Sequence, residues 1–184
     1  MIVVGALLAG GESRRMGKDK SALVLEGQTL AERALATLAA VSDRQVILGH
    51  GRGCPGGVPR LPDAVAGQGP SAGLRALLAS GLGDAYLVLP VDMPGVTPAH
   101  LQRLVAALAG HHAACFVRAG VLEPLPCALD AGAALAPGEQ RLGALLQGLR
   151  LARVLLGDND ADDLRNLNSP DELEALSARS FRND

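Results

Sequence analysis

The chain has 184 residues, of which 48% are hydrophobic and 20% charged, and its formal net charge at pH 7 is −2. This length and composition fit one compact domain, residues 1–184, and exclude an intrinsically disordered chain. The near-neutral charge excludes a strongly basic nucleic-acid footprint, and one tyrosine, two phenylalanines and no tryptophan are too few for stacking single-stranded nucleic acid.

Short apolar runs alternate with helical patterns along the chain, which is typical of an α/β domain. The first run, residues 2–9, is too short to span a membrane and has no basic segment before it, so we expect a buried strand. Several runs are continuous, as expected for strands covered by helices on both faces. Further strands are expected at residues 45–48, 86–89, 113–117, 126–129 and 153–156.

Local capping signals mark the helix starts. Thr29 and Glu32 have the spacing of a capping box, and prolines stand at the first helical position after Gly69 and Thr97. Apolar residues at helical spacing follow these starts. Helices are therefore expected to begin near residues 29, 70, 97, 141 and 169, the fourth covering 141–149. The histidines at 100, 111 and 112, at a helix start and in a loop, are expected to be exposed.

Three scattered cysteines, Cys54, Cys115 and Cys127, lack the C-x-x-C spacing of a zinc site and form no even-numbered disulfide framework. We therefore expect a reduced environment and a cytoplasmic protein. Two long loops, residues 10–21 and 49–69, interrupt the pattern, and loops of this length in a compact domain are usually functional or mobile.

The first loop is rich in glycine and cations. Glycines let the backbone approach a ligand and turn its N–H groups toward phosphate oxygens. Arg14, Arg15, Lys18 and Lys20 lie within seven residues and can neutralise a triphosphate, although solvated charges on a surface turn are the alternative. Both lysines of the chain stand here, which indicates that the compact ammonium group itself matters. Neither a Walker P-loop nor a dinucleotide G-x-G-x-x-G motif is present.

Several polar residues are candidates for a site at the strand ends. Asp92 follows the expected strand 86–89, and a carboxylate there can hold Mg²⁺ against a triphosphate, although it can also stabilise a turn between two prolines. Asp63 precedes a glycine-rich helix start and is otherwise a turn former. Asn166 and Asn168 share one face of an extended segment, where loop and helix-cap chemistry is the alternative.

The segment from Leu8 to Lys20 reads L-A-G-G-x-S-x-R-M-G-x-D-K. It resembles the signature loop of the nucleotidyltransferases that modify the molybdenum cofactor, a family similar in fold to sugar-nucleotide pyrophosphorylases. The resemblance implies a single-domain, three-layer Rossmann-like α/β fold of the nucleotide-diphospho-sugar transferase type with a mostly parallel central sheet. It also implies a nucleotide-binding N-terminal half and an acceptor-binding C-terminal half.

The resemblance also implies roles for particular residues. Arg15 and Lys20 would neutralise the triphosphate, and Asp92 would contact both the metal ion and the nucleotide. Asn166 and Asn168, similar to the family's N-x-N-T-P motif, would face the pterin or the metal centre. Residues implied to bind the nucleotide or the pterin cofactor are Leu8, Ala9, Gly10, Gly11, Lys20, Asp63, Asp92, Asn166 and Asn168. One departure is that the family's Asn after the second strand is replaced by Leu48-Gly49-His50-Gly51.

The expected reaction is the Mg²⁺-dependent transfer of GMP from GTP to the phosphate of the molybdenum-pterin cofactor. Guanine is favoured because members of the family's guanylyl branch carry a loop similar to L-A-G-G, whereas its cytidylyl branch tends to L-A-A-G. Gly10 stands at the position that differs, and its lack of a Cβ leaves space for a purine. Recipient molybdoenzymes or other cofactor-biosynthesis proteins are conceivable partners, whereas nucleic acid and membranes are not expected. Three alternatives stay open: a cytidylyltransferase for the same cofactor, a guanylyltransferase for a corrinoid or sugar phosphate, and a non-enzymatic cofactor-delivery protein.

Overall fold

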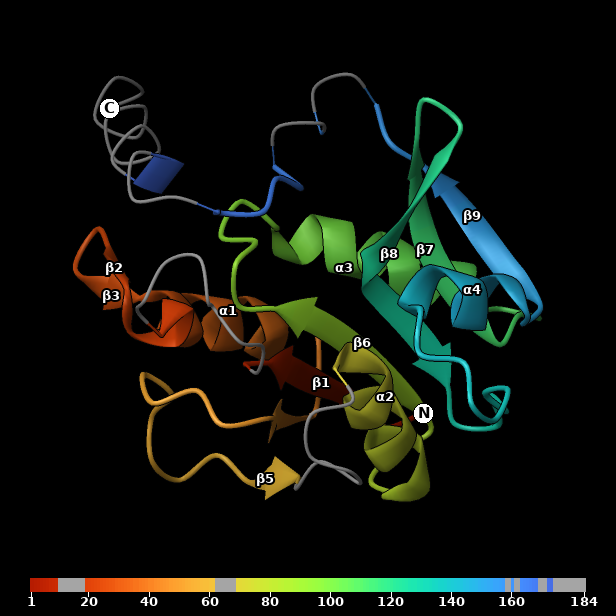
Figure 1. Ribbon diagram of the computed structural model, residues 1–184, viewed down its shortest axis with the longest axis horizontal. Helices are drawn as coiled ribbons and strands as arrows, with labels where there is room; N and C mark the ends of the chain where they lie inside the picture. The colour runs from red at the N-terminus through yellow and green to blue at the C-terminus, as the bar shows by residue number, and fades with distance from the viewer. Residues whose placement is uncertain (10–18, 62–68, 158–159, 161–162, 169–171, 174–184) are drawn as a thin grey trace.

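The computed structural model describes residues 1–9, 19–61, 69–157, 160, 163–168 and 172–173. Within this part of the chain, a seven-stranded sheet forms the middle of the molecule, in the order β5-β4-β1-β6-β8-β7-β9 (Figure 1). Its strands are β1 (Val3–Leu8), β4 (Arg44–Leu48), β5 (Arg60–Leu61), β6 (Ala85–Pro90), β7 (Ala113–Arg118), β8 (Val121–Asp130) and β9 (Leu151–Leu155).

The sheet is mostly parallel, as expected. β1 pairs in parallel with β4 and β6, and β7 pairs in parallel with β9. β8 pairs antiparallel with both β6 and β7, and it is the strand that reverses direction among those described. The carboxyl ends of β1, β4 and β6 therefore meet at one edge of the sheet, where ligands of open α/β sheets bind.

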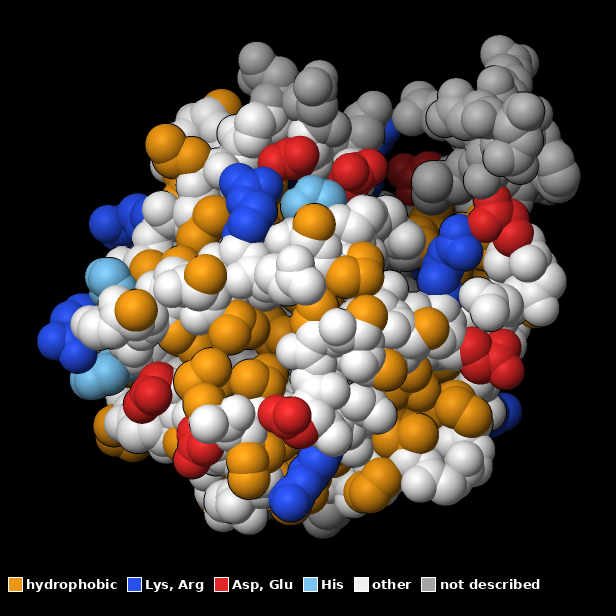
Figure 2. All heavy atoms as spheres, turned by 180° about the vertical axis from the view of Figure 1, so that it is seen from behind, with side chains coloured by type: hydrophobic (Ala, Val, Ile, Leu, Met, Phe, Trp, Pro, Cys, Tyr) orange, Lys and Arg blue, Asp and Glu red, His pale blue; other side chains and the backbone are white. Residues whose placement is uncertain are grey.

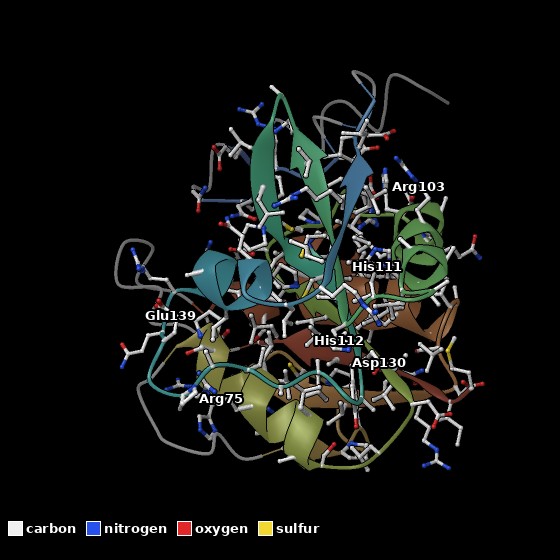
Figure 3. All side chains as sticks on the ribbon, turned by 90° about the vertical axis from the view of Figure 1, so that its right-hand side faces the viewer. Arg75, Arg103, His111, His112, Asp130 and Glu139 are labelled. Atoms are coloured by element: carbon white, nitrogen blue, oxygen red, sulfur yellow. The ribbon has the colours of Figure 1, made fainter. Side chains whose placement is uncertain are left out.

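Helices cover both faces of the sheet, which gives the three layers that the sequence predicts (Figure 3). α1 (Leu30–Ala39) and α3 (Pro98–Ala107) lie on one face, and α2 (Pro70–Ala79) and α4 (Leu142–Gln147) lie on the other. Successive residues of β1 point to opposite faces of the sheet. Leu7 therefore packs in the core beneath α1 and α3, and Leu8 packs in the core beneath α2 and α4. A continuous apolar strand is therefore needed here.

The predicted helix starts agree with the structure for α1, α2 and α3. The Thr29 hydroxyl accepts a hydrogen bond from the Glu32 amide at 3.1 Å, and the Glu32 carboxylate accepts one from the Thr29 amide at 2.8 Å. Thr97 caps α3 in the same way, and Pro70 is the first residue of α2. α4 is shorter than the expected 141–149, and the start expected at Ser169 lies outside the described residues.

Three short strands were not expected. β2 (Val24–Leu25) and β3 (Gln28–Thr29) form a hairpin around Glu26 and Gly27, both of which have positive φ. β5 lies within the expected loop 49–69 and pairs with the end of β4. Strands of two residues carry too little alternation to be recognised, so neighbouring strands rather than local pattern define them.

β8 is longer than the predicted strand 126–129 because a register shift accommodates its prolines. Residues 121–123 pair with the end of β7, and Cys127 to Leu129 pair with its beginning. Pro124 and Pro126 lie in between, at the irregularity, where a missing N–H interrupts no ladder bond.

The expected exposure of His100 is wrong. The residue is only 5% exposed, because its Nδ1 accepts a hydrogen bond from the Thr97 amide at 3.1 Å and its ring packs edge-on against Phe116. A histidine at this position completes the capping box that a glutamate usually completes. His111 and His112, in the turn after α3, are half-buried rather than exposed (Figure 3).

The outer surface of the α1 and α3 layer is partly apolar (Figure 2). Alanines such as Ala36, Ala39 and Ala106 are exposed on these helices and contribute to this area. The helices α1, α2 and α3 have 10 residues each, and none of the helices in the described part of the chain is long and apolar enough to cross a membrane.

Candidate active site

Asp92 lies just beyond the carboxyl end of β6. The strand before it is buried along its whole length and pairs with β1, which fixes the position of the following turn at the edge of the sheet. The Asp92 carboxylate is 23% exposed, and its Oδ2 lies 2.8 Å from the Nζ of Lys20. The structure therefore brings together two of the predicted site residues that are 72 positions apart.

Lys20 is the first residue of η1 (Lys20–Ala22), a short 3-10 helix that follows the glycine-rich loop. Its side chain is 16% exposed. Besides Asp92, the ammonium donates to the Leu167 carbonyl at 2.5 Å and approaches the Asn168 Oδ1 at 3.5 Å. Three oxygens from two distant segments thus surround one compact cation.

The segment that carries Leu167 and Asn168 packs closely against the turn after β6. The Leu167 amide donates to the Asp92 carbonyl at 2.7 Å, and the Leu167 side chain is buried in the core of the α1 and α3 face. Gly95 allows a second close approach, because a Cβ at this position would lie 2.7 Å from the Asp163 carbonyl oxygen. Asn168 therefore faces Lys20 from an anchored segment, and its Nδ2 donates to the Asn166 carbonyl at 3.2 Å.

The predicted nucleotide-contacting residues fall into two groups. Leu8 and Ala9 are described and buried; the Leu8 carbonyl accepts from the Val91 amide at 3.1 Å, and the Ala9 amide donates to Leu48 at 2.9 Å. Their side chains belong to the core, so a ligand would meet only backbone here. Gly10, Gly11, Arg15 and Asp63 lie outside the described residues.

Asp19 also lies in this region, and no role was expected for it from the sequence. Its Oδ1 accepts hydrogen bonds from the Ser21 amide at 3.0 Å and the Ser21 hydroxyl at 2.6 Å. Its Oδ2 accepts one from the Arg52 amide at 2.6 Å. Burial alone would raise the pKa of Asp19, but these donors outweigh it and hold the pKa below its usual value. The signal in the sequence was its place directly before Lys20 in the signature loop.

The site has the chemistry to hold a divalent cation together with a phosphate ligand. In the described part of the chain, no group of three or more His, Cys, Asp or Glu side chains could enclose a metal ion. Mg²⁺ usually binds one or two carboxylates together with substrate phosphates and water. The carboxylate, carbonyl and amide oxygens around Lys20 are ligands of the type that Mg²⁺ prefers, so the residues present fit such an ion.

Comparison with known sequences identifies a family. The sequence matches the family described as MobA-like NTP transferase domain over residues 5–161. A molybdenum cofactor guanylyltransferase from Rhodobacter capsulatus is 34% identical over 194 residues, which cover 100% of this chain and 99% of that protein. A protein of the same name from Xanthomonas euvesicatoria pv. vesicatoria (strain 85-10) is 32% identical over 184 residues, covering 94% of this chain and 93% of that protein.

Comparison with solved structures agrees with this fold. The molybdopterin-guanine dinucleotide biosynthesis protein A from Archaeoglobus fulgidus superposes with a TM-score of 0.77 at 23% identity, covering 97% of this chain and 99% of that one. The three-layer fold with a mostly parallel sheet, expected from the sequence, is therefore confirmed by the architecture and by its structural neighbours.

Proposed function

Because the chain belongs to the MobA-like NTP transferase family, we propose that it transfers GMP from GTP to the phosphate of the molybdenum-pterin cofactor. The products are pyrophosphate and the guanine dinucleotide form of the cofactor. The observation that carries the proposal is the convergence of Lys20, Asp92, the Leu167 carbonyl and the Asn168 side-chain oxygen at the carboxyl ends of β1 and β6. The names of the two similar guanylyltransferases support this donor and acceptor.

In the proposed reaction, an oxygen of the cofactor's terminal phosphate attacks the α-phosphorus of GTP. The new P–O bond forms as the bond between the α-phosphorus and the bridging oxygen breaks, and pyrophosphate carries away the electron pair. Both reactants are anions, so the protein's task is to position them and to neutralise charge. The N-terminal half would hold the nucleotide and the C-terminal half the acceptor.

Lys20 is suited to the triphosphate because it presents three N–H donors from one compact charge. Its bond to the Leu167 carbonyl can hold the side chain in place while another N–H turns to a phosphate oxygen. Arg15, in the same signature loop, would add a second positive charge. Gly10, Gly11 and Asp63 would contact the nucleotide as the family pattern implies.

Asp92 would hold Mg²⁺, with the Asn168 side-chain oxygen close enough to assist. The ion held there would supply positive charge that stabilises the leaving pyrophosphate. Asn166 and Asn168 are both exposed; Asn168 would act on the metal side because it lies near Lys20, whereas Asn166 would contact the pterin.

The test is incubation of the protein with each of the four nucleoside triphosphates, Mg²⁺ and molybdenum-loaded pterin cofactor. Pyrophosphate release and the dinucleotide product are measured together. We expect both with GTP and neither when Mg²⁺ is removed by a chelator. Product formation with CTP alone would instead indicate a cytidylyltransferase, and turnover only with a corrinoid or sugar phosphate would indicate another acceptor.

A further inference from the structure

The Asp19 carboxylate joins two segments that are distant in sequence. Its Oδ1 accepts hydrogen bonds from both the amide and the hydroxyl of Ser21. These bonds fix the first turn of η1, the helix that begins at Lys20. Through Oδ2 the carboxylate binds the Arg52 amide, 33 positions along the chain. Both oxygens of this carboxylate are thus occupied by donors of the protein itself.

The segment 49–53, which follows β4, is held against η1 by further contacts. The Gly53 amide donates to the Ser21 hydroxyl at 2.9 Å, so Ser21 relays the contact from Asp19. The Arg60 guanidinium donates to the Gly49 and Gly51 carbonyls at 3.3 and 3.0 Å.

Two glycines allow the backbone of the segment 49–53 to contact the backbone beside η1 directly. A Cβ at Gly53 would lie 2.4 Å from backbone atoms of Ala22, and a Cβ at Gly51 would lie 2.9 Å from the Ala9 Cβ. No side chain larger than hydrogen fits these two positions unless the backbone moves. The segment 49–53 therefore packs directly against both ends of the glycine-rich loop.

We propose that Asp19 is a positioning residue of the transfer reaction, one that fixes Lys20 and the segment 49–53 as a single preorganised wall of the nucleotide site. The inference rests on the proposed function for the reaction it serves. Its geometric basis is independent, because β4 lies beside β1 and segment 49–53 borders the same edge of the sheet as Lys20. Three protein donors already engage the two carboxylate oxygens, so we assign Asp19 to positioning rather than to metal binding.

The experiment compares Asp19→Asn with a matched control, Asp43→Asn. Asp43 also uses a carboxylate oxygen to accept from a backbone amide, that of Val3 at 2.7 Å, at the amino end of β1 and far from Lys20 in the sheet. The asparagine at position 19 keeps the size of the side chain but replaces one acceptor oxygen with a donor. Three quantities are measured: kcat/KM for GTP, the Mg²⁺ concentration that gives half-maximal rate, and hydrogen exchange of the amides at 52 and 53.

For Asp19→Asn we expect faster exchange at residues 52 and 53, and a decrease of about 10- to 100-fold in kcat/KM, the scale of a displaced catalytic group. The half-maximal Mg²⁺ concentration should stay unchanged. For Asp43→Asn we expect none of these three changes. Wild-type kcat/KM in Asp19→Asn would overturn the proposal, as would a raised Mg²⁺ requirement, which would make Asp19 a metal ligand.

A second variant keeps the proposal testable if Asp19→Asn does not fold. Ser21→Ala retains the carboxylate but removes the hydroxyl that links Asp19 to Gly53, and it should show the same changes to a smaller extent. Wild-type exchange and kinetics in Ser21→Ala would then overturn the proposal. Failure of the proposed function is a separate outcome, because it appears as absent GTP turnover in the wild type. In that case, hydrogen exchange at residues 52 and 53 still tests the role of Asp19. The ratio of kcat/KM between variant and wild type, measured with the triphosphate that the protein does use, tests it as well.

Discussion

Replacing Lys20 by methionine should destabilise the protein and abolish most of its activity. The Lys20–Asp92 pair is 16% and 23% exposed, which places it between a surface ion pair and a buried one. Surface pairs contribute about 0–1 kcal/mol, whereas breaking a fully buried pair costs about 3–5 kcal/mol. We therefore expect Lys20→Met to lower the free energy of unfolding by about 1–3 kcal/mol, because the Asp92 carboxylate loses its cation. For a chain of this size that is a fall in Tm of about 2–12 °C.

A double-mutant cycle with Asp92→Asn separates the ion pair from the catalytic roles. The double variant has neither charge, so part of the lost stability should return, with a coupling energy of about 1–2 kcal/mol. Urea unfolding followed by circular dichroism measures all four proteins. Additive losses, with no coupling, would refute the reasoning that the two charges compensate each other in the free protein.

Activity should behave differently from stability in the same cycle. Both charges act on the substrate in the proposed reaction, so the double variant should regain stability without regaining turnover. Removing one preorganised donor typically lowers kcat by about 100- to 1000-fold, and we expect Lys20→Met to show a loss of this size in kcat/KM for GTP. Recovery of activity in the double variant would mean that the pair is structural only.

Lys20→Arg tests whether a point charge is needed at this position. The three surrounding oxygens converge on one atom, whereas a guanidinium presents a broad planar fork. We therefore expect Lys20→Arg not to rescue kcat/KM, and Lys18→Arg, at a variable position of the signature loop, to change it little. Full activity in Lys20→Arg would show that positive charge alone suffices.

Three further predictions concern stability and ligand binding. Asn168→Ala should weaken GTP binding in the presence of Mg²⁺, and Asn166→Ala should weaken only cofactor binding. Calorimetry with each ligand measures both, and identical effects of the two substitutions would contradict separate roles for the two asparagines. Gly95→Ala should lower both activity and stability, the latter by about 1–3 kcal/mol, because its Cβ meets backbone of the C-terminal segment. Gly143→Ala, in α4 with open space around it, should instead add about 0.5–1 kcal/mol and serves as the control. Tyr86→Phe should be neutral or stabilising by up to about 1 kcal/mol in thermal unfolding, since its buried hydroxyl has no hydrogen-bond partner among the described residues.

Features that depend on neighbours in the chain were predictable from the sequence. The capping box of Thr29 and Glu32 involves residues three positions apart, and the structure reproduces it atom for atom. The strands 86–89 and 113–117 were found because long apolar runs between turn signals need no partner to be recognised. The signature loop pointed to the family, and the family model agrees with it.

Features that depend on packing were not predictable. His100 has the sequence context of an exposed helix start, but the Phe116 ring on β7 covers it. The β2–β3 hairpin is defined by pairing rather than pattern. The contacts of Asp19 have no local pattern, because its partner Arg52 comes from a different loop.

The fold class, the starts of α1, α2 and α3 and the family follow from the sequence, because each is encoded in local spacing or in one continuous motif. The assembly of the site depends on the tertiary fold. The Lys20 ammonium meets Asp92 72 positions away and the Leu167 carbonyl 147 positions away. Such contacts arise from parallel strand order and from the burial of Leu167 in the core, and no local pattern encodes which distant backbone carbonyl will meet a given lysine.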